Sequence, residues 1–481
     1  MAALTRRQLL ARGAGAGAAA AALLLDASRA AAQEAPPAAP PPPTQPAAVP
    51  PPPAVALPSE RMLKGVSLIG DVNPYDDSLG VRPYLLGGAR PTEVVTFWII
   101  WPEVQPHRPE PQTLAASFAQ LSDPAGPAAA KIAALDAQIA QANADGRRVG
   151  LTLYQAFADW AHPGIGCLNP AMEQGQGGPG LPGQGRLGNG SYVPDDRSED
   201  GPWAWFVAWC CARWADTGGE RTPGPGRAGA VAGNPQGARL DWLQPLNEPN
   251  LAWWPQLDDR YPDGTIVSAV AEMMRSAAAV AARYRNGEAL PRGPELLMPN
   301  TADVVADDSD HGTPWRAFTR ELVAQLAGWQ PPTPVGWSQH NYGDVKYGPQ
   351  QEGPGRGLWR AQEAIELLRT GGWPDPALWL TEGGYQFGVS ETAPDVYVVD
   401  PAKTAGDDAK DAFAEQVAKL AENWTAMAQL PVRLWSQYLV NDKDVRFQSS
   451  LRGPVRTAPD GTRVPFDPPY PAYALWPTLG A

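Results

Sequence analysis

Two glutamates each stand directly after an apolar run of the type that forms a buried strand. Glu248 follows the run LDWLQPLN (240–247), and Glu382 lies in the run PALWLTEGG (376–384). Asparagine, threonine, tyrosine and tryptophan surround both positions, and no cluster of basic residues does. Such a pair suits glycoside hydrolysis, in which one carboxylic acid protonates the departing oxygen while the other carboxylate attacks or stabilises an oxocarbenium-like centre.

The elements that would position these glutamates follow from an alternation of apolar runs and amphipathic segments after residue 59. Eight runs are predicted to form strands, at 63–70, 92–100, 148–155, 240–247, 295–300, 334–342, 376–384 and 432–439. Helices are predicted at 128–146, 203–215, 265–285, 315–327, 358–370 and 409–429. Long loops are predicted at 163–201, 251–264, 343–357 and 385–408.

This order of elements predicts an α/β fold, a (β/α)8 TIM barrel with long loops. The alternative is an open, doubly wound sheet, but no Gly-rich phosphate-binding fingerprint follows the first predicted strand. In a barrel the C-terminal ends of the strands meet at one mouth, where the chemistry takes place. Glu248 ends the fourth predicted strand and Glu382 the seventh, so both side chains are expected at that mouth.

Several motifs in this order resemble those of the retaining glycoside hydrolases of clan A, the 4/7 superfamily that holds the family 5 cellulase-like and family 39 xylosidase-like enzymes. That group carries Asn-Glu-Pro at the end of strand four, seen here as Asn247–Glu248–Pro249, and a glutamate at the end of strand seven, here Glu382. It commonly has His-x-Tyr at strand six, here His340–Asn341–Tyr342, and a tryptophan on strand eight, here Trp435. The segment FWIIWPEVQP (97–106) also resembles strand two of the group.

The resemblance implies that Glu248 is the general acid/base and Glu382 the nucleophile. The acid needs a raised pKa, whereas the nucleophile must be ionised and held by hydrogen bonds, with Tyr342 as the expected donor. Asn247 would bind the sugar 2-hydroxyl. The other substrate-binding candidates are His340, Trp435 as the platform under the sugar, Trp98, Trp160, Trp253 and Trp254. Ordinary core packing is the alternative for these residues.

One position departs from the resembled group. Those enzymes often carry an arginine on strand two that helps to hold the nucleophile, whereas Thr96 stands at the matching position here. This departure keeps open a carbohydrate-binding barrel without catalysis. A transglycosylase that uses the same residues is a further alternative. A lipase or peptidase is disfavoured because no G-x-S-x-G motif occurs. The sugar, the linkage and endo or exo action do not follow from the sequence.

The N-terminal segment has the features of an export signal. Arg6 and Arg7 precede a short apolar run, and the segment closes on Ala30–Ala31–Ala32, which predicts a Tat-type signal peptide at 1–32. Residues 33–58 are rich in proline and alanine and are predicted to form an extended linker. The catalytic domain is then expected at 59–481, and the protein is expected to be secreted or extracytoplasmic.

Composition narrows the partners. The chain of 481 residues carries a formal net charge of −13, which disfavours nucleic acid and anionic membrane surfaces as partners. We expect a carbohydrate substrate, no stable membrane anchor and a monomer. None of the four histidines and three cysteines has metal-ligand spacing, so no metal or other cofactor is expected. In an exported protein Cys167 could pair with Cys210 or Cys211, and the alternative is a set of free buried cysteines.

Overall fold

A closed barrel of eight parallel strands forms the centre of the molecule, in the order β1-β10-β7-β6-β5-β4-β3-β2. In this computed structural model β1 (Leu63–Leu68) pairs with both β2 (Val94–Ile99) and β10 (Val432–Tyr438), so the first and last barrel strands close the ring. The predicted (β/α)8 TIM barrel is confirmed. The structure describes residues 61–69, 72–154, 159–161, 197–215, 237–251, 265–285, 294–304, 313–386, 389–393, 396–399, 412–442, 449–458, 460–465 and 469–481.

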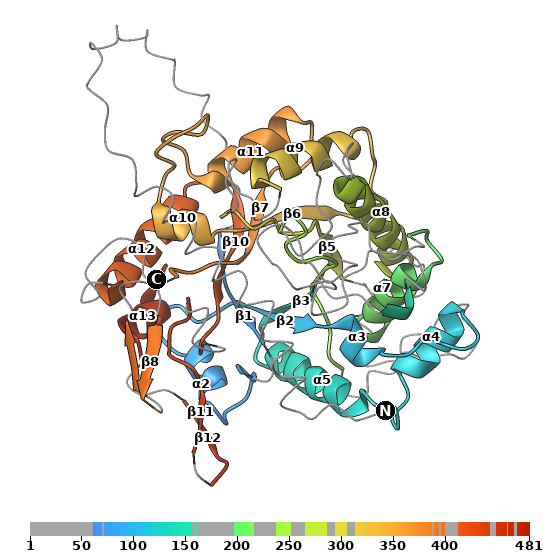
Figure 1. The fold of residues 1–481 in the computed structure, drawn as a ribbon, viewed down its shortest axis with the longest axis horizontal. Helices are drawn as coiled ribbons and strands as arrows, with labels where there is room; N and C mark the ends of the chain where they lie inside the picture. The colour runs from blue at the N-terminus through green and yellow to red at the C-terminus, as the bar shows by residue number, and fades with distance from the viewer. Residues whose placement is uncertain are drawn as a thin grey trace, which may run out of the picture.

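All eight predicted strands are present, and each lies within its predicted range. The remaining barrel strands are β3 (Arg148–Leu153), β4 (Trp242–Gln244), β5 (Glu295–Leu297), β6 (Val335–His340) and β7 (Leu378–Glu382). The predicted helices correspond to α5 (Ala129–Ala144), α7 (Pro202–Arg213), α8 (Thr265–Arg285), α9 (Trp315–Gln325), α11 (Arg360–Thr370) and α12 (Ala412–Met427). Figure 1 shows these helices arranged around the central strands.

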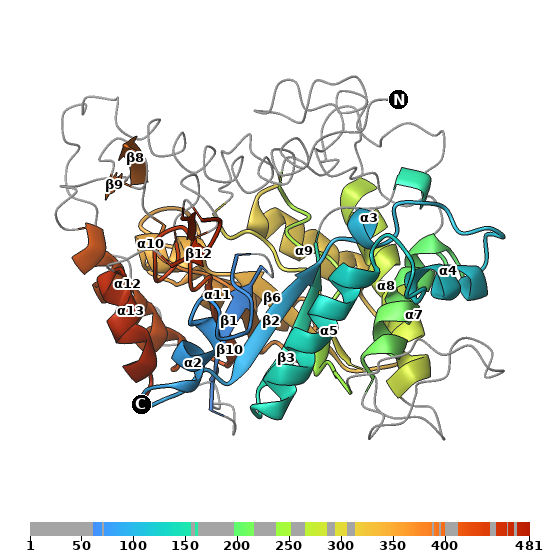
Figure 2. The ribbon, with the colours of Figure 1, turned by 90° about the horizontal axis from the view of Figure 1, so that it is seen from below.

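Several short helices, turns and hairpins were not predicted, because segments of so few residues are too short to show a helical or strand period. They are α2 (Val81–Leu86), α3 (Trp101–Val104), α4 (Leu114–Leu121), α10 (Tyr342–Tyr347), α13 (Pro471–Leu475), the 3-10 turns η1 (Asp159–Ala161) and η2 (Trp476–Thr478), and the hairpins of β8 (Val389–Ala393) with β9 (Val396–Val399) and β11 (Arg456–Thr457) with β12 (Arg463–Val464). Figure 2 shows α10 and the β8–β9 hairpin toward the same end of the barrel. Within the described residues, no helix has the length and apolar character needed to cross a bilayer.

Large apolar side chains fill the N-terminal end of the barrel. The rings of Trp242 on β4 and Trp379 on β7 lie 5.1 Å apart between centroids, and they pack with Val94, Leu297 and Leu434. Glycines on neighbouring strands make room for both indoles. A Cβ at Gly150 would lie 2.2 Å from Trp242 Nε1, and one at Gly336 would lie 2.7 Å from Trp379 Nε1.

Polar side chains form the next layer toward the C-terminal ends of the strands. Thr152 Oγ1 donates to Gln244 Oε1 at 3.3 Å, and Gln244 Nε2 donates to Ser338 Oγ at 3.0 Å. Ser338 Oγ in turn donates to the carbonyl oxygen of Met298 at 2.5 Å. These buried hydrogen bonds link β3, β4 and β6 beneath the mouth of the barrel.

The helix layer takes up many of the 19 tryptophans. Along α7, Trp203 and Trp209 are buried, and Phe206 stacks on Trp101 of α3 at 4.9 Å. Cys210 and Cys211 are buried free cysteines of the same helix. The two cysteines thus fit the alternative of free buried thiols rather than a disulfide with Cys167, which itself lies outside the described residues.

Candidate active site

Glu248 stands at the C-terminal end of β4 in an unusual backbone conformation. Its φ is 44°, in the left-handed region that residues other than glycine seldom adopt. Asn300, which follows β5, holds this turn: its Oδ1 accepts from Glu248 N at 2.7 Å, and its Nδ2 donates to Asn247 Oδ1 at 3.0 Å. The same Nδ2 lies 3.3 Å from Thr381 Oγ1 on β7, so one asparagine links the two strand ends that carry the glutamates.

Glu382 is the last residue of β7, and its carboxylate is almost completely buried. The side chain is 6% exposed, compared with 14% for Glu248. Tyr342, the first residue of α10, donates its hydroxyl to Glu382 Oε2 at 3.2 Å. The sequence predicted this donor correctly but placed Tyr342 on strand six, which ends at His340.

His340 connects the two glutamates. Its Nδ1 lies 2.7 Å from Glu248 Oε1, and its Nε2 lies 3.7 Å from Glu382 Oε2. The imidazole is fully buried and packs edge-on against Tyr342. Glu248 and Glu382 therefore converge on one ring, and they do so at the C-terminal ends of β4 and β7, as the barrel prediction requires.

Burial and mutual charge shift the ionisation of this cluster. Burial raises the pKa of the Glu382 carboxyl to about 8, the charge of Glu248 adds to the rise, and His340 and the Tyr342 hydroxyl oppose it. Burial lowers the pKa of His340, but the charges of Glu382 and Glu248 outweigh it, so the net pKa is raised above the ordinary value. The pKa of Tyr342 is well above its ordinary range, chiefly through burial, so the phenol is a neutral donor.

This pattern differs from the sequence expectation in one respect. The raised pKa falls on Glu382, which the resemblance makes the ionised nucleophile. The physical reason is that Glu382 is the more buried carboxyl and accepts one hydroxyl bond, with no arginine or lysine among the described residues in contact with it. Thr96, at the position where the resembled group often carries arginine, is buried, and its hydroxyl makes no hydrogen bond in the described part of the chain.

Four aromatic side chains adjoin the glutamates at the mouth. Trp98 of β2 stacks on Tyr154 at 4.8 Å and lies 5.7 Å from Tyr438 of β10, which meets Tyr342 edge-on at 6.1 Å. Both glutamate charges raise the pKa of Tyr154 further, after burial. Sequence reasoning included Trp98 and Tyr342 but missed Tyr154 and Tyr438. Their position at the C-terminal ends of predicted strands three and eight was the available signal.

Trp435 does not lie at the mouth of the barrel, where the prediction placed it as a platform. Its side chain is fully buried outside the barrel, where it packs against Trp424 of α12 and Trp476, and its Nε1 donates to Asn423 Oδ1 at 2.7 Å. Side chains alternate along a strand, and Leu434 and Tyr438 occupy the inward positions of β10, so Trp435 points outward. Tyr438 is the β10 aromatic at the mouth.

Trp160 is not brought to the glutamate pair. Trp160, in η1, donates from Nε1 to the carbonyl oxygen of Gln105 at 2.9 Å and packs edge-on against Trp101. Trp253 and Trp254 lie outside the described residues. The described residues contain no group of three or more His, Cys, Asp or Glu side chains that could hold a metal ion.

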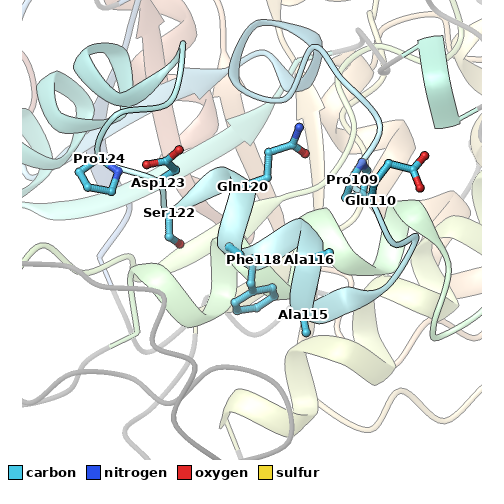
Figure 3. A pocket seen from close by; sticks show the side chains of 10 residues that line it. Pro109, Glu110, Ala115, Ala116, Phe118, Gln120, Ser122, Asp123 and Pro124 are labelled. Carbon is cyan, nitrogen blue, oxygen red and sulfur yellow. The ribbon is translucent and has the colours of Figure 1, made fainter.

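A separate hollow lies along α4, as Figure 3 shows. Its volume is about 730 Å³, and its lining includes Pro109, Phe118, Gln120 and Asp123. None of its lining residues belongs to the glutamate cluster, so it is not part of the candidate active site.

Comparisons with known proteins find distant structural likeness only. Neither protein-family profiles nor the curated proteins match the chain. Solved structures similar to it include the GH1 β-glucosidase from Exiguobacterium antarcticum B7, at 13% identity over 86% of this chain and 96% of that one, with a TM-score of 0.42. A β-glucosidase from Thermotoga maritima in complex with glucoimidazole shows 12% identity over 87% and 97%, with a TM-score of 0.42.

A psychrophilic glycoside hydrolase family 10 endo-β-1,4-xylanase shows 12% identity over 82% of this chain and 92% of that one, with a TM-score of 0.44. Likeness at these values carries no conclusion about what this chain does. The barrel itself is established by the strand pairing described above.

Proposed function

We propose that this chain is an exported retaining glycoside hydrolase that cleaves O-glycosidic, β-configured bonds of poly- or oligosaccharides by double displacement. The observation that carries the proposal is the convergence of Glu248 and Glu382 on the imidazole of His340 at the mouth of the barrel. Two carboxyl groups at one mouth, beside an aromatic wall, are the groups that glycoside hydrolysis requires.

In the first step, Glu382 attacks the anomeric carbon while Glu248 gives its proton to the departing glycosidic oxygen, which leaves as an alcohol. In the second step, Glu248 takes a proton from a water molecule, and the water oxygen displaces Glu382 from the anomeric carbon. With the proton from water on Glu248 and Glu382 released as a carboxylate, both groups are back in their starting states. Asn247 is proposed to bind the 2-hydroxyl of the sugar.

The electrostatics of the cluster fit a pair that holds one proton at a time. Burial raises the pKa of Glu382 and the charge of nearby Glu248 raises it further, so the two carboxyl groups resist double ionisation. The cycle also needs a single proton on the pair, located on Glu248 when Glu382 attacks. His340 lies between the two groups, and its protonated form stabilises the charge that Glu382 carries before attack.

The first experiment is to incubate the purified chain with β-glucans, xylan, mannan and aryl β-glycosides, and to follow product anomers by NMR. Glu382→Ala should abolish turnover. Glu248→Ala should keep turnover on aryl glycosides with good leaving groups and should be accelerated by azide, because azide replaces the water that needs a base. Glu366→Ala, an exposed glutamate that pairs with Arg369, serves as the control and should match wild type.

The outcomes separate the competing functions. Retained anomeric configuration together with the two variant phenotypes supports the proposal. Glycan binding without cleavage would instead show a non-catalytic carbohydrate-binding barrel, and oligosaccharides longer than the substrate would show transglycosylation. The glycosyl azide should be the β anomer from Glu248→Ala, because azide displaces Glu382 from the covalent intermediate; a β-glycosyl azide from Glu382→Ala and an α-glycosyl azide from Glu248→Ala would exchange the two proposed roles.

Export is proposed from the sequence of residues 1–32. Replacing Arg6 and Arg7 with lysine should retain the full-length chain in the cytoplasm, whereas wild type should appear outside it without its first residues. Cell fractionation with N-terminal sequencing measures both results. Equal export of the variant would contradict a twin-arginine route.

A further inference from the structure

Asn341 occupies the position before α10 at which an asparagine side chain normally caps a helix. Its side chain makes no cap hydrogen bond to this helix. Asp303, from the segment after β5, takes over that role: Oδ1 accepts from Gly343 N at 2.9 Å and Oδ2 accepts from Asp344 N at 3.0 Å. The fully buried amide of Asn341 is therefore not needed as the cap of this helix and makes its contacts elsewhere.

The amide of Asn341 contacts the main chain of Glu382. Its orientation follows from its neighbours: Nδ2 donates to the carbonyl oxygen of Glu382 at 3.0 Å. Oδ1 then lies 3.1 Å from Asn423 Oδ1, and the single N–H of Trp435 Nε1 is shared between these two oxygens, at 2.8 Å from Asn341 and 2.7 Å from Asn423. The backbone N–H of Asn341 donates to the same Glu382 carbonyl oxygen, also at 3.0 Å. One residue thus holds the Glu382 backbone with two donors, both on its carbonyl oxygen.

The joint is packed so closely that the next residue has to be glycine. A Cβ on Gly383 would lie 1.6 Å from the Asn341 amide atom that faces Glu382, which is Nδ2 in this orientation, well inside any allowed contact. Trp435 of β10 and Asn423 of α12 contact the other side of the amide. Trp435, which was predicted to lie under the sugar, instead donates to the Asn341 amide.

We propose that Asn341 is a positioning residue, which fixes the Glu382 backbone so that its carboxylate stays aligned with His340 and Tyr342. The proposal rests on the proposed function for its catalytic consequence, since Glu382 is the nucleophile there. Three consecutive residues then serve the same glutamate: His340 and Tyr342 contact the carboxylate, and Asn341 holds the main chain between them.

The test compares Asn341→Ala and Asn341→Asp with Asn73→Ala as the matched control. Asn341→Asp keeps the size and the acceptor for Trp435 but has no N–H for the Glu382 carbonyl oxygen. Asn73 is an equally buried asparagine that bonds to the backbone of Asn441, and it has no contact with the glutamate cluster. All variants are compared per folded molecule, with unfolding midpoints measured alongside.

Two readouts are used. The first is kcat against KM on the substrate found for wild type: both Asn341 variants should lose roughly 100-fold in kcat with little change in KM, because a misplacement of about 1 Å has such an effect. The second is NMR titration of histidine-labelled protein, with the His340 signal assigned by its loss in His340→Gln. The charged groups around that ring are Glu248, Glu382 and Asp303.

In Asn341→Ala the His340 titration should shift toward lower pH, because a displaced Glu382 carboxylate stabilises the imidazolium less. Asn341→Asp is compared by kcat alone, because its own carboxylate would add a charge beside the ring. Asn73→Ala should leave both kcat and the titration unchanged. Unchanged kcat in both Asn341 variants, together with an unchanged titration in Asn341→Ala, would overturn the proposal, and so would an equal loss of kcat in Asn73→Ala. If wild type cleaves no glycan, the proposed function fails, and the His340 titration alone then decides whether Asn341 positions Glu382.

Discussion

At its N-terminal end the barrel buries Trp242 and Trp379, whereas at its C-terminal end it buries Glu382, His340 and Tyr342. The first set removes apolar surface from water, and each such side chain contributes roughly 1.5–3 kcal/mol to folding. The second set removes ionisable groups from water, which opposes folding unless each group is paired.

The backbone shows the same contrast. Inward-facing glycines at the N-terminal end let two indoles approach the strands, whereas Glu248 at the mouth holds a φ of 44° that is typically worth about 1–3 kcal/mol of strain. Stability is thus concentrated at one end of the barrel, and the glutamate pair, to which we assign the proposed reaction, lies at the other end, where burial of ionisable groups reduces stability.

The largest effect is expected from removal of an indole at the N-terminal end. Trp379→Ala should lower the free energy of unfolding by about 3–5 kcal/mol, because it leaves a cavity next to Trp242. Denaturant titration measures the loss. Trp98→Ala at the mouth, where the ring is only partly buried, is the matched comparison and should cost less. Equal losses would show that stability is not concentrated at one end.

The second prediction concerns the buried charge at the mouth. The folded pKa of Glu382 is raised from 4.5 to about 8, so its stabilising contribution is present below 4.5 and is lost as the pH rises through about 8. Glu382→Gln should therefore gain on the order of 2–4 kcal/mol relative to wild type over that window. The raised pKa of His340 acts in the same direction in wild type.

Urea titrations at a series of pH values measure this difference. Glu366→Gln, on an exposed helix surface, provides the reference and should track wild type throughout. A gap between Glu382→Gln and wild type that does not change with pH would refute the assignment of a raised pKa to Glu382.

The third prediction tests the glycine contacts. Gly336→Ala should destabilise by about 1–3 kcal/mol, because the new methyl group would overlap the Trp379 indole. Gly87→Ala is the control: its φ is −84° and its nearest neighbour would lie at 3.3 Å. Thermal unfolding distinguishes the two, and a neutral Gly336→Ala would show that the indole moves aside without cost.

The smallest effect is expected in the polar layer between the two ends. Thr152→Val keeps the shape but removes the donor to Gln244, so the free energy of unfolding should fall by about 1 kcal/mol. Activity per folded molecule should stay within a factor of about two, because no glutamate contact is lost. A larger loss of activity would show that this polar layer also helps to position the glutamates at the mouth.

The strands could be predicted from the sequence because apolar runs of four to eight residues separated by amphipathic segments specify a parallel barrel. Glu248, Glu382 and Tyr342 were predictable for the same reason, since they follow such runs directly. The direction of Trp435 was not, because both faces of a parallel strand are buried and the alternation does not reveal which face is inside.

Asn300, Tyr154 and Asn341 were missed for a different reason. Each acts through a partner on another strand, and the register between strands is fixed by packing rather than by the local sequence. Asn341 also stands between two residues with obvious chemistry, and an asparagine before a helix is normally explained by capping. Only the position of Asp303 shows that the cap comes from elsewhere.

Closure of the barrel by its first and last strands constrains when the barrel can fold during synthesis. Leu63 pairs with Leu434 and Ser67 with Tyr438, and Lys64 Nζ donates to the carbonyl oxygens of Trp476 and Leu479. These contacts cannot form until synthesis has passed the last strand, so β1 keeps one edge unpaired for most of synthesis, and β7 has an unpaired edge from the time it is made until β10 follows. A chain that ends before β10 would therefore be an open sheet with two unpaired edges. Such a chain would tend to aggregate and would depend on chaperones.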